Sequence, residues 1–163
     1  MTTDRFPTTA RGLKKMQEEL KQLTSIERPR ISAEIEVARA HGDLRENAEY
    51  HAAKEKQGHI EGRIQNLGAW ISRAEVIDVT GFKGQKKVMF GANVKLLDVE
   101  SDKEVAYRIV GEFEADLKKR WISVNSPVAR GLIGKVVGDV AMIQSPGGNR
   151  EYEVLSVDFE DVA

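Results

Sequence analysis

Two apolar stripes at helical spacing occupy the first half of the chain, and they match each other in reverse order. Facing residues of an antiparallel helix pair have position numbers with a constant sum, and narrow stripes suit pairing with one other helix. We therefore predict an antiparallel coiled-coil hairpin over residues 1–78, with its turn between Asp43 and Leu44. The matching pairs are Leu13 with Ala74, Met16 with Ile71, Leu20 with Leu67, and Leu23 with Ile64.

Capping residues at the ends of both stripes agree with this hairpin. Residues 1–8 read as an irregular lead-in, after which Thr8 or Thr9 can cap a helix reaching about Ala40. Pro29 lies inside that helix and is expected to kink or split it. Gly42 can end the first helix in a left-handed conformation, and Asp43 can cap a second helix running from about Glu46 to Glu75.

The pattern changes after Asp78, where glycines and β-branched residues separate short segments. Ser126 and Pro127 are typical of a helix start, and that helix is expected to end near Gly131 or Gly134. Residues 79–163 are thus predicted to form a small α+β domain with half-buried antiparallel strands. The predicted strands are Ala92–Val99, Glu104–Val110, Trp121–Val124, Asp139–Gln144 and Glu151–Val157, with a hairpin turn over Ser145–Asn149.

Composition excludes several classes of function. The net charge is −1, with no basic half, so broad electrostatic binding of DNA is not expected. The chain has no cysteine, which excludes disulfides, thiolate metal sites and cysteine nucleophiles. It has no long apolar run and no signal-peptide core, so a soluble cytoplasmic protein is expected. It also lacks a phosphate-binding glycine loop and a Gly-x-Ser-x-Gly motif.

Polar and charged residues are densest at the predicted tip, near 41–47. Asp43 and Glu46 are three positions apart, so both carboxylates can face one point and serve as oxygen ligands for Mg²⁺. The same spacing suits a capping box, the more ordinary role, and the two roles can coexist. The spacing alone leaves both interpretations open.

The other tip residues have ordinary surface explanations. The basic residues can pair with neighbouring acidic ones, the histidines suit turn and surface roles, and Tyr50 is expected to pack near the tip. An arm of this kind, roughly 45 Å long at about 1.5 Å per residue, fits either a dimerising spacer or a probe that enters a cavity. The residues concerned are Arg39, Arg45, Lys54 and Lys56, with His41 and His51.

The segment from Ala38 to Glu55 resembles the tip signature of the bacterial Gre transcript cleavage factors. Several later segments resemble the same family in the same order, so the resemblance covers essentially the whole chain. The near-neutral charge is similar to that of the GreA type rather than the more basic GreB type. The later segments are Val76–Val79, Phe90–Ala92, Tyr107–Gly111, Ile122–Pro127, Leu132–Lys135 and Ser145–Gly148.

This resemblance implies a function in transcription elongation. The hairpin would enter the secondary channel of RNA polymerase, and a C-terminal domain resembling the FK506-binding-protein fold would hold the channel rim. Asp43 and Glu46 would be the catalytic pair that helps the polymerase cleave the 3′ end of backtracked RNA. They would share Mg²⁺ with the polymerase, so the chain would not itself be an enzyme. The resemblance also implies that the factor acts as a monomer.

The resemblance also implies contact residues in both parts of the chain. Candidates for contact with the nascent RNA or the tip surroundings are Arg39, Arg45, Asn47, Tyr50 and Lys54. Candidates for binding the polymerase are Ser123, Asn125, Ser126 and Pro127. Arg45 occupies a position that varies in the family and bears on the electrostatics beside the acidic pair.

Two other classes of function remain open. One is a channel-binding regulator of RNA polymerase that does not stimulate cleavage; the presence of both Asp43 and Glu46 argues against it. The other is a prolyl isomerase, suggested only by the fold resemblance of the second domain, and fold does not fix function. The scattered aromatic residues there do not suggest the aromatic-lined pocket of such an enzyme.

Overall fold

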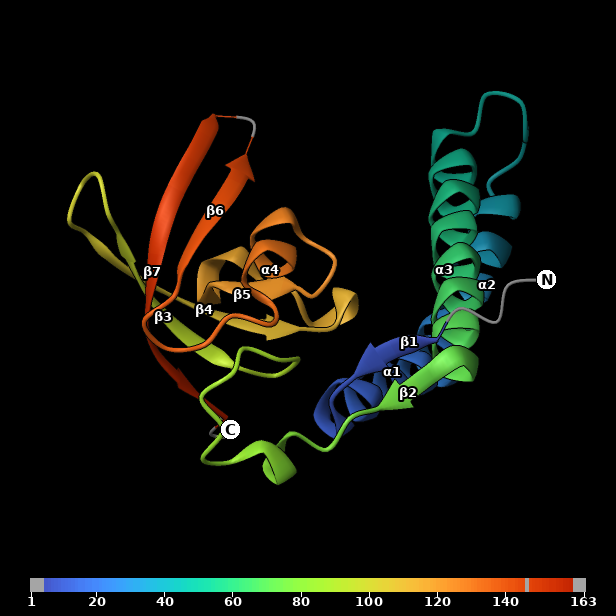
Figure 1. The fold of residues 1–163 in the computed structure, drawn as a ribbon. Coiled ribbons are helices and arrows are strands. Elements are labelled where there is room, and N and C mark those ends of the chain that lie inside the picture. The colour runs from blue at the N-terminus through green and yellow to red at the C-terminus, as the bar shows by residue number, and fades with distance from the viewer. Residues whose placement is uncertain (1–4, 146, 160–163) are drawn as a thin grey trace. The chain divides into compact units, whose positions relative to one another are not determined.

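The computed structural model describes residues 5–145 and 147–159. The chain divides into two compact units (Figure 1). The hairpin unit is built on Leu13–Ala74, and the sheet unit combines Phe6–Gly12 with the chain from Glu75 onward. None of the helices in the described part of the chain is long and apolar enough to cross a membrane.

The hairpin unit consists of helices that run out along one path and return along another. The outgoing path comprises α1 (Ala10–Gln22), the π-helical turn η1 (Leu23–Glu27) and α2 (Arg28–Arg39); α3 (Ala48–Arg73) returns. Thr9 caps α1, because its hydroxyl accepts the Gly12 N–H at 3.0 Å. The loop between α2 and α3, residues 40–47, is centred on the predicted turn. Gly42 has a φ of +114°, which confirms its predicted left-handed conformation.

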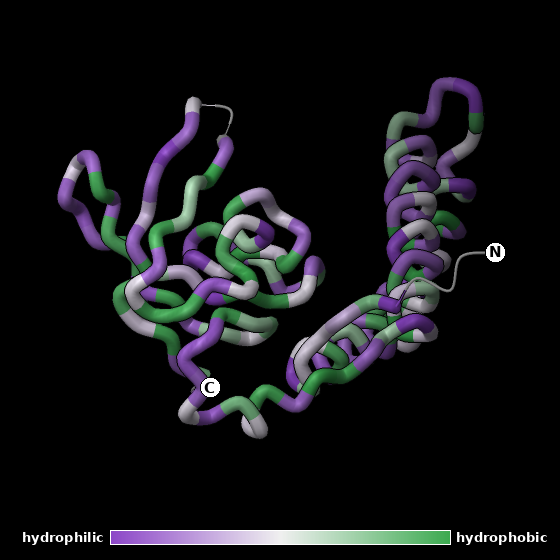
Figure 2. The backbone as a smooth tube through the Cα atoms, viewed as in Figure 1, coloured by the Kyte–Doolittle hydropathy of each residue, from purple (hydrophilic) through white to green (hydrophobic). Residues whose placement is uncertain are grey.

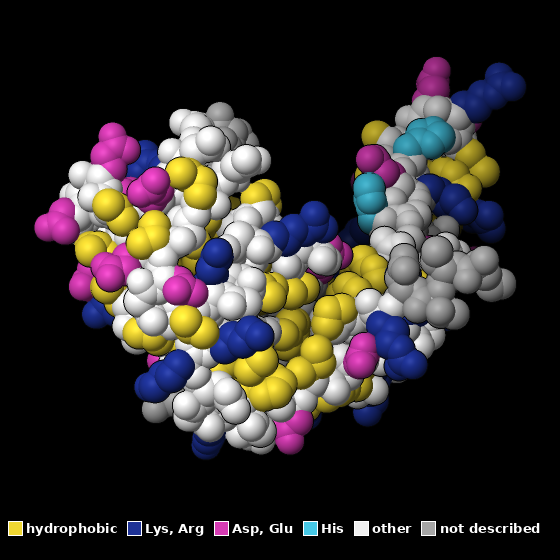
Figure 3. All heavy atoms as spheres, in the orientation of Figure 1, with side chains coloured by type: hydrophobic (Ala, Val, Ile, Leu, Met, Phe, Trp, Pro, Cys, Tyr) yellow, Lys and Arg dark blue, Asp and Glu magenta, His cyan; other side chains and the backbone are white. Residues whose placement is uncertain are grey.

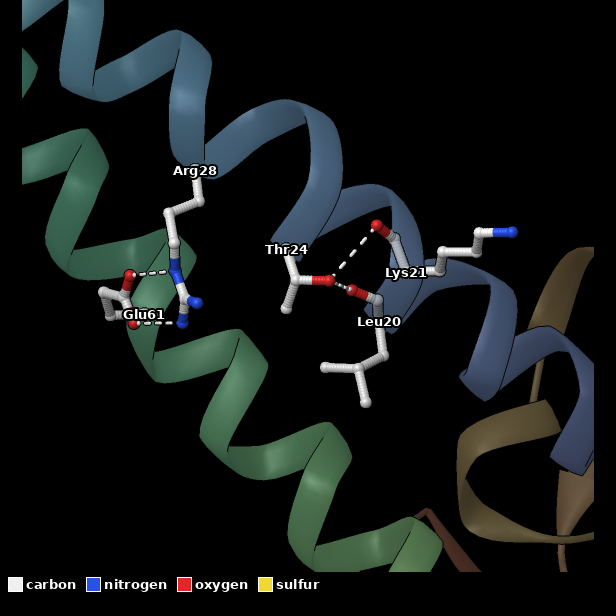
Figure 4. A network of polar contacts seen from close by, with 5 residues as sticks. All are labelled: Leu20, Lys21, Thr24, Arg28 and Glu61. Carbon is white, nitrogen blue, oxygen red and sulfur yellow. Dashed lines mark hydrogen bonds and ion pairs between the residues drawn. The ribbon is translucent and has the colours of Figure 1, made fainter.

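The predicted interruption at Pro29 takes the form of a widened helical turn. Pro29 has no N–H to donate, and its ring crowds the carbonyl four residues earlier. The Arg28 N–H bonds the carbonyl of Leu23, five residues back. The Thr24 hydroxyl donates to the carbonyls of Leu20 and Lys21 (Figure 4). The outgoing path therefore continues past Pro29 through a π turn.

Apolar side chains and ion pairs hold the two paths together. Met16 and Leu67 are fully buried. Glu19 pairs with Arg63 at 2.9 Å and Arg28 with Glu61 at 2.8 Å, and these pairs run antiparallel along the two paths. A second cluster lies nearer the tip and is made of Ile31, Ile35, Ala53 and Ile60, with Leu23, Tyr50 and Ile64 packed against it.

The sheet unit contains a five-stranded sheet in the order β5-β4-β3-β7-β6. A short helix, α4, packs against β6 (Figure 1), and Ser126 caps it as predicted, accepting the Ala129 N–H at 3.2 Å. The five predicted strands are all present. Their bounds are β3 (Asn93–Asp98), β4 (Glu104–Val110), β5 (Trp121–Ser123), β6 (Val140–Ser145) and β7 (Gly148–Asp158), and α4 spans Pro127–Leu132.

Residues that alternate with more exposed ones along the strands form the core of the sheet unit. Val94 and Leu96 of β3 are buried with Ile109 of β4 and Val154 of β7, and Leu132 of α4 belongs to the same cluster. Figure 2 shows hydrophobic segments along these strands and hydrophilic ones in the tip loop. The hairpin turn predicted over Ser145–Asn149 closes with Ser145 paired to Gly148, while Pro146 lies outside the described residues.

Three features differ from the sequence prediction. Phe6–Thr8 is not irregular but forms β1, which pairs with β2 (Ala74–Val76). Strands β4 and β5 are parallel rather than antiparallel, joined through the 3-10 helices η3 (Glu112–Glu114) and η4 (Leu117–Lys119). A further 3-10 helix, η2 (Val79–Phe82), precedes the sheet. The two strand pairings depend on distant residues, and the 3-10 helix depends on loop geometry. Local periodicity in the sequence predicts neither.

Candidate functional site: an acidic loop at the hairpin tip

Asp43 and Glu46 lie in the loop between α2 and α3, and both are exposed. Neither caps a helix. The cap of α3 is Asn47, whose side-chain oxygen accepts the Tyr50 N–H at 3.0 Å. The prediction that Asp43 caps the second helix is therefore wrong, and so is the capping-box interpretation of the pair.

The physical reason lies in the competition between two good caps. Asp and Asn stabilise a helix start about equally, so the residue types alone do not show whether Asp43 or Asn47 is the cap. Asn47 has an amide as well as an oxygen, and that amide donates to the carbonyl of Ala38 in the last turn of α2, at 2.6 Å. Asp43 instead closes a tight turn by accepting the N–H of Arg45 at 3.0 Å.

The two carboxylates therefore remain available for an outside partner. Asp43 uses one oxygen for the Arg45 N–H. Among the described residues, the Glu46 side chain forms no hydrogen bond or ion pair. Acidic and basic side chains project together at the free end of the hairpin (Figure 3).

Two histidines connect the loop to α3. His41 Nδ1 lies 3.1 Å from Glu49 Oε2, and both side chains are more than half exposed. His51 Nε2 lies 2.9 Å from the carbonyl oxygen of Arg45. The surface and turn roles predicted for the histidines agree with these contacts.

The remaining tip candidates separate into exposed and packed residues. Arg39 and Arg45 have exposed side chains. Lys54 is exposed and donates to Gln57 at 3.2 Å. Tyr50 packs against the hairpin cluster and meets the His51 ring edge-on at 5.7 Å between centroids. Its packing role agrees with the prediction.

The sheet-unit candidates gather in the turn between β5 and α4. The Ser123 hydroxyl accepts the Asn125 N–H at 3.1 Å, and the Asn125 amide donates to Glu112 at 3.1 Å. Asn125 and Pro127 also line an open groove, shared with Arg130, Gly131, Met142 and Gln144. The structure thus brings Ser123, Asn125, Ser126 and Pro127 together on one surface turn.

The acidic pair supplies the candidate metal ligands at the tip. The described part of the chain contains no group of three or more His, Cys, Asp or Glu side chains that could hold a metal ion. Mg²⁺ takes one or two protein carboxylates and fills its other positions with water and phosphate oxygens. The exposed oxygen donors of Asp43 and Glu46 fit such a minimal protein contribution.

Fold and site together define a two-unit protein that carries an exposed acidic loop at the end of a helical arm. The model of the family described as "Transcription elongation factor, N-terminal" matches residues 6–76, and that of "Transcription elongation factor, GreA/GreB, C-term" matches residues 83–159. The chain belongs to the GreA/GreB family of transcription elongation factors.

Individual relatives cover nearly the whole chain. Transcription elongation factor GreA of Anaeromyxobacter sp. (strain K) is 60% identical over 155 residues, which are 95% of this chain and 93% of that protein. GreA of Yersinia pestis is 54% identical over 154 residues, 94% and 98% of the two chains. Among solved structures, GreA factor homolog 1 of Thermus thermophilus is 25% identical, covers 94% of this chain and 99% of that one, and has a TM-score of 0.44.

Proposed function

We propose that this chain is an elongation factor that binds RNA polymerase and stimulates cleavage of the 3′ end of backtracked nascent RNA. One observation carries the proposal: both tip carboxylates are exposed and are not used as helix caps. The family membership supports it, since the relatives at 52–60% identity are named transcription elongation factor GreA.

The hairpin would deliver the acidic pair into the secondary channel. A packed two-helix arm with paired charges along its length suits that task, because it keeps its free end in place without a partner. In this proposal the arm acts as a coiled-coil probe rather than as a dimerising spacer, and the factor acts as a monomer.

Asp43 and Glu46 would hold a Mg²⁺ ion jointly with the polymerase. When bound, the ion would lower the pKa of a coordinated water and neutralise charge at the scissile phosphate. The contribution of this chain is to bring two carboxylates to the ion and to orient the attacking water. The polymerase would supply the remaining ligands, so the factor would activate the polymerase's own nuclease activity without being an enzyme.

Other residues would contribute binding rather than chemistry. Arg39 and Arg45 are exposed beside the acidic pair and suit contact with RNA phosphates. Ser123, Asn125, Ser126 and Pro127 would contact the channel rim from a domain of the FK506-binding-protein type. A protein with these partners would work in the cytoplasm.

A cleavage assay tests the function directly. Polymerase is stalled and backtracked on labelled RNA, the protein is added, and RNA length is followed with time. Cleavage factors shorten the RNA and restore elongation. A channel-binding regulator would instead slow synthesis and leave the RNA length unchanged, and that result would refute the proposal.

A further inference from the structure

Asn47, the cap of α3, and His51, within α3, each bond a backbone carbonyl in or beside the tip loop. The amide Nδ2 of Asn47 donates to the carbonyl oxygen of Ala38 at 2.6 Å. The imidazole Nε2 of His51 lies 2.9 Å from the carbonyl oxygen of Arg45. Because a carbonyl only accepts, Nε2 carries the proton of this bond. We call Asn47 and His51 the tip clasp.

Asn47 closes the base of the loop. Ala38 lies in the last turn of α2, whereas Asn47 precedes the first turn of α3, so one amide joins the two ends of the loop. The oxygen of the same side chain caps α3 through the Tyr50 N–H. Both ends of the Asn47 amide are thus bonded within the hairpin.

His51 holds the loop between the two carboxylates. Arg45 lies between Asp43 and Glu46, and its N–H donates to Asp43 while its carbonyl accepts from His51. The imidazole is in turn met edge-on by the Tyr50 ring, which packs against the hairpin cluster. The backbone immediately before Glu46 is therefore connected to the packed part of the arm.

We propose that Asn47 and His51 are positioning residues that fix the tip loop so that Asp43 and Glu46 face the partner as a pair. This inference rests on the proposed function, and it assigns Asn47 to the loop rather than to RNA contact. Exposed loops with few packed contacts open easily, and small misplacements of reacting groups cost large factors in rate. The tip clasp adds two bonds to those that the loop already makes through Asp43 and His41.

Asn47→Ser separates the two roles of Asn47. Serine is as good a helix cap as asparagine, but its short hydroxyl does not reach the Ala38 carbonyl while capping α3. Asn47→Ala is the matched variant, because it removes both the cap and the clasp. His51→Phe keeps an aromatic ring beside Tyr50 and removes the bond to Arg45.

Four measurements on the full chain test the inference. These are thermal melting, ¹⁵N relaxation of the backbone amides of residues 41–46, the maximal cleavage rate, and the polymerase affinity measured by competition. For Asn47→Ser we expect wild-type melting and affinity, order parameters falling from about 0.85 toward 0.6, and a cleavage rate lower by about 10-fold. His51→Phe should behave alike, whereas Asn47→Ala should also melt earlier.

Two results would overturn the inference. One is an Asn47→Ser variant whose tip amides relax as in the wild type, because the clasp would then hold nothing. The other is an Asn47→Ser variant that melts as early as Asn47→Ala, because Asn47 would then stabilise the fold as a whole. Relaxation and melting need no polymerase, so they decide on the clasp even if wild-type protein fails to stimulate cleavage and the proposed function falls.

Discussion

The guanidinium of Arg28 holds the carboxylate of Glu61 through two parallel hydrogen bonds, Nε to Oε1 at 2.8 Å and Nη2 to Oε2 at 2.9 Å (Figure 4). Arg28 is the first residue of α2, directly after the π turn, and Glu61 lies in the interior of α3. The pair therefore braces the two paths of the hairpin where the outgoing helix is irregular.

This pair should make hairpin stability depend on pH. The hydrogen bond from Arg28 lowers the pKa of Glu61 below its ordinary value of 4.5. A carboxylate with a lowered pKa stabilises the fold above its unfolded pKa, and that contribution is lost as the pH falls through the folded value. Arg28→Ala should therefore melt earlier than the wild type at pH 7, with the difference shrinking as the pH falls well below 4.5.

Arg30→Ala is the matched control for that experiment. Arg30 pairs with Glu27 on the same outgoing path, three positions away, and does not cross to α3. Its removal should have the smaller effect on melting at pH 7. A gap between Arg28→Ala and the wild type that stays constant from neutral to acid pH would show that the crossing ion pair is not the cause.

Leu67→Ala should strongly destabilise the hairpin unit. Leu67 is 0% exposed, and removing a fully buried leucine side chain costs about 2–5 kcal/mol, depending on how far the cavity collapses. Urea denaturation followed by helical circular dichroism measures the change. Val37→Ala is the control, since Val37 is 60% exposed and its truncation should stay within about 0.5 kcal/mol. Equal effects of the two substitutions would contradict the assigned core.

Glu114 should hold the segment at the end of β1 in place within the sheet unit. Its carboxylate accepts the Thr9 hydroxyl and backbone N–H and the Gly111 N–H. Hydrogen bonds to charged groups contribute about 1.5–3 kcal/mol, so Glu114→Ala should lower the free energy of unfolding of the sheet unit by that order. It should also speed amide exchange in β1, as hydrogen exchange can measure.

Glu112→Ala serves as the comparison for Glu114. Glu112 is exposed and accepts one hydrogen bond from the Asn125 amide. Truncating it should leave exchange in β1 unchanged. If Glu114→Ala exchanges as slowly in β1 as Glu112→Ala does, the carboxylate does not hold the N-terminal strand.

The features predicted well from sequence are those that short-range patterns determine. The mirror order of the two stripes located the turn at Asp43 and Leu44, because helical periodicity is local and the pairing rule needs only position numbers. Ser126 with Pro127 located α4 for a similar reason, since a cap and a first-turn proline both act within one turn.

The features missed depend on partners far along the chain or across a loop. Phe6–Thr8 is too short to show alternation, and its partner, β2, follows the whole hairpin. At the tip, the sequence offers Asp43 and Asn47 as equally good helix caps. In the structure Asn47 caps α3, and its amide also bonds the Ala38 carbonyl across the loop. An asparagine just before a helical stripe was the available signal.

The proposed role of the acidic pair depends on its negative charge, and the double variant Asp43→Asn, Glu46→Gln tests this dependence. The amides keep the size of both side chains and an oxygen for the Arg45 N–H, but they lose the negative charge that would hold a Mg²⁺ ion. We predict that the variant competes with wild-type protein for polymerase undiminished, while cleavage of backtracked RNA falls by about 100-fold. Cleavage at the wild-type rate would show that the charge of Asp43 and Glu46 is not needed.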